Sequence, residues 1–250
     1  MNIKKNFTIY FFILYMQTST IGIVDIQPYQ TNQKSKSIQQ STLISLTNKS
    51  GNESYFLADI NYRIDYKMKK WKYLGILKNS YKKENSRLLS NSGFIHIRAI
   101  KHLNPLYYLE TYIQREYDQF TDLNERQLFG QNIRLNVTLN PNKQIIIAAG
   151  PLIEKESTRS LPTKYYLRVN SYIFYKTNIT QNNTYQTITY LQPALEKITN
   201  FRTYSNHHLI MEINNKIALK TSLLFKYNNT PPNGIKKYDS EINQSINIQF

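Results

Sequence analysis

Alternation of apolar and polar residues with a period of two is the feature of this sequence that most limits its fold. In residues 133–140 every odd position is aliphatic and every even position is polar. The ranges 56–65, 164–176 and 216–227 show a similar alternation. Successive side chains of a β-strand point to opposite faces of its sheet. Each range is therefore predicted to be a strand with one apolar and one polar face.

The length of the alternating segments favours strands that cross a membrane. A half-buried strand of a soluble protein alternates over about four to eight residues, whereas a tilted membrane strand needs about 9–11. Twelve segments with this character, an even number, predict an all-β fold: a closed antiparallel transmembrane β-barrel. We place the strands at 40–48, 53–66, 69–82, 88–102, 106–118, 126–140, 143–155, 163–177, 183–192, 198–214, 216–228 and 239–250.

The connections between these segments alternate between short and long. Tight connections at 67–68, 104–105, 141–142 and 214–215 follow the second, fourth, sixth and tenth strands, so they lie at one end. Longer polar connections at 83–87, 119–125, 156–162 and 229–238 lie at the other end. Short periplasmic turns and longer external loops are typical of outer-membrane barrels.

Composition excludes several other classes. The chain has 21 Tyr and no Cys, and Ile, Tyr and Thr favour strands whereas Ala, a strong helix former, is rare. A helical bundle is excluded on this basis. Without Cys there is no disulfide, no thiolate zinc site and no Cys-linked lipid.

The N-terminus has the three regions of a secretory signal peptide. Lys4 and Lys5 precede a ten-residue apolar run at 7–16, and small polar residues follow. The run is too short for a membrane-spanning helix, which needs about 20 residues. We predict a signal peptide at 1–22, a periplasmic segment at 23–39 and a barrel domain at 40–250. The alternative is that the apolar run is a buried N-terminal strand.

The net charge of +16 has two interpretations. Clustered cations attract nucleic acid or anionic lipid, but an Asn-, Ile-, Lys- and Tyr-rich chain also reflects an AT-rich genome. No run of five like charges marks an interaction tail, so we favour the second interpretation and predict no nucleic-acid partner. The densest cationic cluster is Lys67, Lys69, Lys70 and Lys72, with Trp71 inside it.

The chain contains no motif for catalysis, cofactor binding or metal binding. His207 and His208 are adjacent in a predicted strand, so they face opposite sides and do not readily share a metal. His96 shares the polar face with Arg98, which favours a structural role. We therefore predict that the protein is not an enzyme and has no cofactor. A barrel hydrolase, the alternative, needs a His beside a Ser or a carboxylate at the outer rim.

Charged residues gather on the predicted lumen face of three neighbouring strands. We expect a lumen charge network of Arg98, Glu110, Glu116, Asp118, Arg126 and Arg134. Unpaired buried charges are costly, so one interpretation is a neutralised network that fills the lumen. The other is a constricted polar pore in which rings of charge set selectivity.

Four segments carry a resemblance to a known family. Residues 48–54 (NKSGNES) resemble its G-N-T/S loop, and residues 118–130 resemble its D-x-F-x-x-L-x-x-R-x-x-x-G signature, with Asp118, Arg126 and Gly130 at the key positions. Residues 190–193 and 231–239 resemble its later Y-x-P and P-P-x-G-x-K-x-x-D segments. The chain is thus similar to an uncharacterised outer-membrane β-barrel family described as salt-induced outer-membrane proteins. The resemblance implies a closed outer-membrane barrel and brings no established reaction.

The last residue agrees with this resemblance. Phe250 ends an alternating strand in which Ile242, Ile246 and Ile248 share its face. A terminal Phe in that context resembles the signal that outer-membrane barrels present for assembly.

We therefore predict a barrel of the cell outer membrane with a structural or stress-related role, with a narrow polar channel as a further possibility. Its expected partners are outer-membrane lipids and the barrel-assembly machinery. The alternatives are a soluble exported β-sandwich that binds a ligand and the barrel hydrolase described above.

Overall fold

The computed structural model describes residues 36–50, 54–84, 87–140, 142–214 and 217–248. The predicted signal peptide at 1–22, most of the predicted segment at 23–39, and Phe250 lie outside the described residues.

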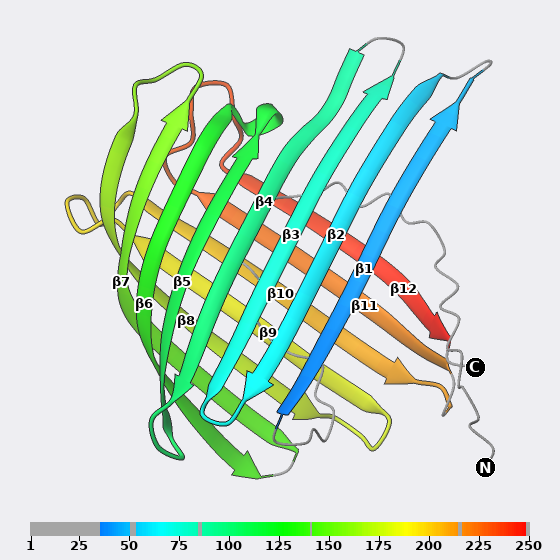
Figure 1. The fold of residues 1–250 in the computed structure, drawn as a ribbon, viewed down its shortest axis with the longest axis vertical. Coiled ribbons are helices and arrows are strands. Elements are labelled where there is room, and N and C mark those ends of the chain that lie inside the picture. The colour runs from blue at the N-terminus through cyan, green and yellow to red at the C-terminus, as the bar shows by residue number, and fades with distance from the viewer. Residues whose placement is uncertain (1–35, 51–53, 85–86, 141, 215–216, 249–250) are drawn as a thin grey trace.

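The described chain forms one antiparallel sheet in which every strand pairs with its neighbours in sequence (Figure 1). This confirms the predicted all-β antiparallel fold, and each predicted strand overlaps an observed one. The strands are β1 (Lys36–Lys49), β2 (Tyr55–Met68), β3 (Trp71–Glu84), β4 (Arg87–His102), β5 (Tyr107–Asp118), β6 (Leu123–Asn140), β7 (Lys143–Thr158), β8 (Lys164–Asn178), β9 (Asn183–Pro193), β10 (Phe201–Glu212), β11 (Ile217–Asn228) and β12 (Tyr238–Ile248).

Some strand ends differ from the prediction because ladder pairing continues past the alternating residues. β1 begins at Lys36, opposite Met68 of β2, and so takes in the end of the predicted segment 23–39. β6 begins at Leu123, which pairs with Thr158 of β7. Polar residues extend a strand when a neighbouring strand offers hydrogen bonds, and alternation alone does not reveal this.

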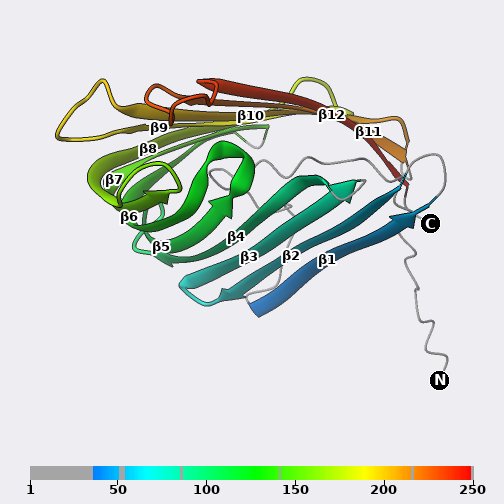
Figure 2. The same ribbon diagram turned by 90° about the horizontal axis from the view of Figure 1, so that it is seen from above.

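The predicted closure of the barrel is not seen in this structure. Among the described residues no ladder joins β1 to β12, so the sheet is curled but open. Figure 2 shows the two halves of the curled sheet facing each other, with β1 and β12 at its free edges. Alternation along a strand fixes its two faces, but it carries no information about which strands pair.

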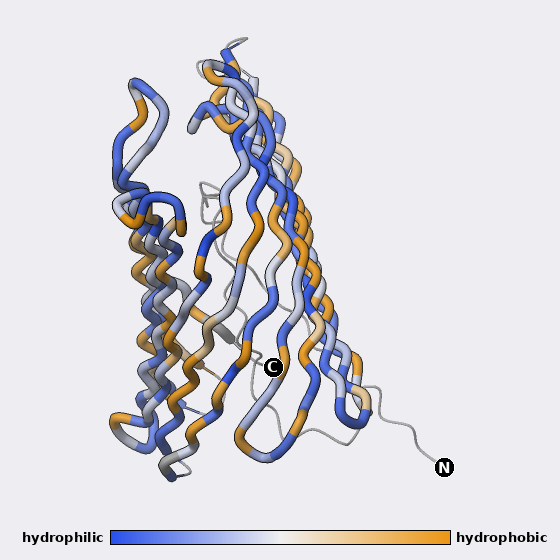
Figure 3. Tube along the Cα trace, turned by 90° about the vertical axis from the view of Figure 1, so that its left-hand side faces the viewer, coloured by the Kyte–Doolittle hydropathy of each residue, from blue (hydrophilic) through white to orange (hydrophobic). Residues whose placement is uncertain are grey.

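The two faces of the sheet have opposite character, as predicted. On β4, Ile95 and Ile97 of the outward face are 43% and 48% exposed, whereas His96 and Arg98 between them are 1% and 2% exposed. Figure 3 shows this alternation of hydrophobic and hydrophilic residues along the strands. An apolar outer surface around a polar interior is the pattern of a membrane β-barrel.

The register places the connections predicted as short and those predicted as long at opposite ends. The connection predicted as long at 83–87 is an exception in length, because β3 runs to Glu84 and β4 begins at Arg87. The short-turn end contains the two-residue turn at 69–70 and the described connection residues 103–106, 142, 179–182 and 213–214. The long-loop end contains the 3₁₀ turn η1 (Gln119–Thr121) and the connections at 194–200 and 229–237. Lys69 and Asp122 have left-handed φ angles of 46° and 58°, which sharp turns require.

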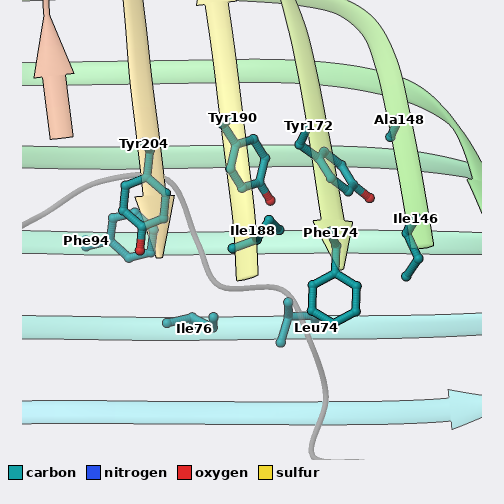
Figure 4. Packing of buried hydrophobic residues seen from close by; sticks show 10 residues of the cluster. All are labelled: Leu74, Ile76, Phe94, Ile146, Ala148, Tyr172, Phe174, Ile188, Tyr190 and Tyr204. Carbon is teal, nitrogen blue, oxygen red and sulfur yellow. The ribbon is translucent and has the colours of Figure 1, made fainter. Parts of the chain in front are cut away.

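The interior contains an apolar cluster that joins opposite halves of the sheet. Leu74, Ile76 and Phe94 from β3 and β4 face side chains from β7–β10 (Figure 4). Aromatic contacts extend this packing. The ring centroids of Tyr172 and Tyr190 lie 4.9 Å apart in a tilted arrangement, and those of Tyr190 and Tyr204 lie 6.1 Å apart, edge to face. The curled sheet is therefore held by contacts across its interior as well as by its ladders.

Among the described residues, no helix has the length and apolar character needed to span a membrane.

The outward face predicts a depth-dependent response to charge. Ile173 lies near the middle of β8 on the outward face and is 48% exposed, and Tyr165 lies on the same face near the strand end. We expect Ile173→Arg to lower the free energy of unfolding by about 2–4 kcal/mol in lipid, and Tyr165→Arg by about 0–1 kcal/mol. Denaturant unfolding in lipid vesicles measures both changes. Equal costs at the two positions would contradict an outward face that contacts lipid.

Candidate functional site: a charge network on the inward face

Glu110 lies at the centre of the buried polar network. Its side chain is fully buried and accepts hydrogen bonds from both sides. Arg98 Nη1 lies 2.8 Å from Oε2, and Arg134 Nη1 lies 3.2 Å from Oε1. Tyr172 of β8 donates to Oε1 across the interior at 2.7 Å. One carboxylate thus connects β4, β5, β6 and β8.

Arg98 is held in place by a chain of neighbours. Its Nε donates to His96 Nε2 at 3.3 Å, and His96 Nδ1 lies 3.0 Å from Gln114 Oε1. The guanidinium carbon lies 4.6 Å from the ring centroid of Tyr112, a cation–π contact. A guanidinium with these partners keeps a fixed orientation toward Glu110.

A second cluster surrounds Glu154 toward the long-loop end. Its two carboxylate oxygens accept from Arg168 and Arg202. Arg202 also donates to Glu156 at 2.5 Å. Arg168 Nη1 lies 3.1 Å from the carbonyl oxygen of Asn200, so this cluster fastens the β9–β10 connection to the wall.

The structure arranges the predicted network as two ion-paired groups joined by Gln114, whose Oε1 lies near His96 and whose Nε2 donates to Glu116 Oε2 at 3.2 Å. Arg98, Glu110 and Arg134 lie together, whereas Glu116 pairs with Arg126. Asp118 has a different contact: its Oδ1 accepts from the backbone N–H of Phe120 at 2.9 Å and caps η1.

Sequence reasoning did not find the members of the network on β7, β8 and β10. They are Glu154, Glu156, Arg168 and Arg202. Assigning alternate residues of β7, β8 and β10 to the inward face, as for β4–β6, would have placed these four residues on the polar face. Contacts such as Arg202 with Glu154, 48 residues apart, depend on how the sheet curls, and strand alternation does not contain that information.

The signature in residues 118–130 has a structural explanation. Asp118 caps the turn and Arg126 neutralises Glu116. Gly130 lies opposite Tyr112 on β5, and a Cβ at this glycine would come within 2.2 Å of the tyrosine ring. Glycine thus leaves space for the ring that stacks on Arg98.

The interior offers little space beside this network. A cavity lined by His96, Tyr112, Asn170 and Tyr190, among others, has a volume of about 10 Å³. That is close to the minimum for a single water molecule. The arrangement can bind the walls together and neutralise charge, but this cavity does not accommodate a solute.

The described residues contain no group of three or more His, Asp and Glu side chains that could hold a metal ion. His208 faces inward, where its Nδ1 lies 2.7 Å from Ser222 Oγ. His207 faces outward, and its Nε2 lies 2.8 Å from Ser205 Oγ. Its Nδ1 lies 2.9 Å from both Thr187 Oγ1 and Tyr185 OH. The two histidines thus occupy opposite faces, as the sequence predicted.

A single antiparallel sheet with an apolar outer face and an ion-paired interior defines a porin-like β-protein. The solved structure described as "NanC porin structure in rhombohedral crystal form" has this fold, with a TM-score of 0.51 and 9% sequence identity. The alignment covers 85% of this chain and 99% of the porin chain. No curated protein matches the sequence. The chain belongs to the family described as "Protein of unknown function, DUF481", whose profile matches residues 43–250.

The network predicts that breaking a buried ion pair lowers the free energy of unfolding much more than breaking an exposed one. Glu110→Gln leaves Arg98, which is 2% exposed, without a carboxylate, so we expect a loss of about 3–5 kcal/mol in the free energy of unfolding. Arg115→Gln removes the partner of Glu125 at 2.6 Å, but the Arg115 side chain is 70% exposed, and we expect about 0–1 kcal/mol. Denaturant titration in detergent micelles compares the two variants. Similar losses would mean that water solvates the interior network.

Proposed function

We propose that the protein is a β-barrel of the cell outer membrane in which β1 and β12 pair to close the sheet, with a structural or stress-related role in the envelope. The porin-like fold, the apolar outward face and the arrangement of short turns and long loops support this proposal. The resemblance to proteins described as salt-induced supports a role in stress.

We further propose that the interior is a packed plug and not an open channel. The observation that carries this proposal is the contact between opposite walls, in which Tyr172 of β8 donates to Glu110 of β5 at 2.7 Å. The apolar cluster that includes Leu74 and Phe174 adds a second connection between the walls. Opening a path for solutes would break both.

The expected partners follow from the same proposal. Outer-membrane lipids would cover the apolar outward face, and the barrel-assembly machinery would insert the barrel into the membrane. The proposal includes no nucleic-acid partner. Several of the arginines face inward and pair with carboxylates, which removes them from any surface that could meet a polyanion.

Refolding the protein into detergent and into lipid vesicles tests membrane insertion. We expect the unboiled protein to migrate differently from the boiled protein on a gel, because a closed barrel resists unfolding by the gel detergent. Recovery of the folded protein in buffer without detergent would instead favour the soluble β-sandwich.

Conductance across a planar bilayer then distinguishes a plug from a pore. We expect wild-type protein to show no stable current steps. The double variant Glu110→Gln/Tyr172→Phe removes the polar contact between the walls with little change in volume, and we expect it to show brief openings. Steady wild-type steps would establish the narrow polar channel and contradict the plug.

One observation favours a second candidate, the barrel hydrolase: Ser205 Oγ lies within hydrogen-bond distance of a histidine. We propose that this pair is structural, because Ser205 is only 8% exposed and Thr189 Oγ1 also lies 2.8 Å from its Oγ. A fluorophosphonate probe that reacts with activated serines should leave the wild type unlabelled. Labelling that disappears in Ser205→Ala, while a Ser171→Ala control keeps it, would establish the hydrolase.

A further inference from the structure

The lysine cluster around Trp71 is divided by the strand geometry. Lys72 faces inward, where its Nζ lies 3.4 Å from Asp65 Oδ1. Lys69 and Lys70 form the exposed turn between β2 and β3, at the lower edge of Figure 1. Lys69 and Lys70 are therefore on the outer rim of the sheet, and Lys72 belongs to the interior. Lys67, the ladder partner of Lys72, is exposed at the end of β2.

A third lysine joins this rim from the neighbouring strand. Lys101 of β4 is the ladder partner of Trp71, and its Nζ lies 5.5 Å from the centroid of the indole ring. The backbone N–H of His102 donates to the carbonyl oxygen of Lys70 at 2.7 Å, which holds the end of β4 against the turn. Lys101 thus lies beside the indole ring, and Lys69 and Lys70 form the turn that directly precedes Trp71. We call these three lysines the rim lysines.

Trp71 begins a stack of aromatic rings on the outward face. Its ring lies 5.9 Å from that of Tyr73, and Tyr73 lies 6.1 Å from Tyr66, with interplanar angles of 10° and 20°. Trp and Tyr are enriched where a membrane meets water, since their rings are apolar and their edges are polar. This stack marks the level of the lipid headgroups at the short-turn end.

The turn beside Trp71 carries two cations, whereas Glu212, the exposed last residue of β10, is a carboxylate at the same end of the sheet. The described turn residues of the short-turn end, at 69–70, 103–106, 142, 179–182 and 213–214, include no Asp or Glu. The long loops are mixed, with Asp122 and Glu196 beside Lys197 and Lys236. A cationic rim beside an aromatic stack complements a surface of negative charge.

From this arrangement we infer that the rim lysines and Trp71 bind the headgroup phosphate of an anionic phospholipid in the membrane leaflet at the short-turn end. The inference rests on the proposed insertion in a membrane and adds a preference for one lipid class. The aromatic stack would lie along the upper acyl chains, and the lysines would reach the phosphate above it.

The chain provides its own reporter because Trp71 is its single tryptophan. Bromine quenches indole fluorescence only at close range, so lipids brominated near the headgroup end of the acyl chains report which lipid contacts Trp71. We would reconstitute the full chain in phosphatidylcholine and titrate brominated phosphatidylglycerol or brominated phosphatidylcholine. We expect phosphatidylglycerol to associate about 3- to 10-fold more strongly at low salt, with the preference falling as salt rises.

Variants assign the preference to the rim lysines. The triple variant Lys69→Asn/Lys70→Gln/Lys101→Gln should reduce the preference to about 1, and Asn suits the left-handed φ at position 69. The matched control Lys236→Gln/Lys237→Gln removes two cations from the long-loop end and should keep the preference. The single variant Lys69→Asn, in an exposed turn, should lower the preference in part even if the triple variant folds poorly.

Equal quenching of the wild type by the two brominated lipids would overturn the inference while leaving membrane insertion intact. A preference that persists in the triple variant would also overturn it. If neither brominated lipid quenched Trp71, this face would not contact lipid, and both the inference and the proposed insertion would fail.

Discussion

The ion-paired carboxylate of Glu110 is the interaction on which the interior of this structure depends. A buried carboxylate is stable only when hydrogen bonds and opposite charges replace the water it has lost. Arg98 and Arg134 provide the charge, and Tyr172 provides a hydrogen bond from the opposite half of the sheet. Glu110 and its three partners lie on four strands. The curvature of the sheet that brings these side chains together and the ion pairing that neutralises them therefore depend on each other.

Gly130 and the ring of Tyr112 both serve to hold Arg98 in position beside Glu110. Arg98 keeps its orientation because Tyr112 lies beneath it, and Tyr112 has space because residue 130 has no side chain. The second cluster at Glu154 repeats the arrangement of one carboxylate between two guanidinium groups nearer the long loops. Two such clusters and an apolar core lie in the interior. In the proposed plug, the external surfaces are the places where the protein meets other molecules.

Those surfaces differ between the two ends. The long-loop end mixes both signs of charge, whereas the described short turns contain cations and no carboxylates. A high net charge had suggested either a polyanionic partner or a compositional bias. In the structure some of the cations pair with Glu and Asp in the interior, and others form a rim beside Trp71. The position of the rim cations beside Trp71 points to a lipid surface as the binding partner. The net charge alone does not distinguish a lipid surface from other polyanions.

Sequence by itself determined the number of strands, their order along the chain and the face on which each residue lies. These features are local, because alternation with a period of two follows from the geometry of a single strand. It also placed Arg98, Glu110 and Arg134 on one face. Only the tertiary structure decided that Tyr172 reaches Glu110 and that Arg202 reaches Glu154. Such contacts depend on the curl of the whole sheet, which arises from the twist of many strands and has no signature in any one of them.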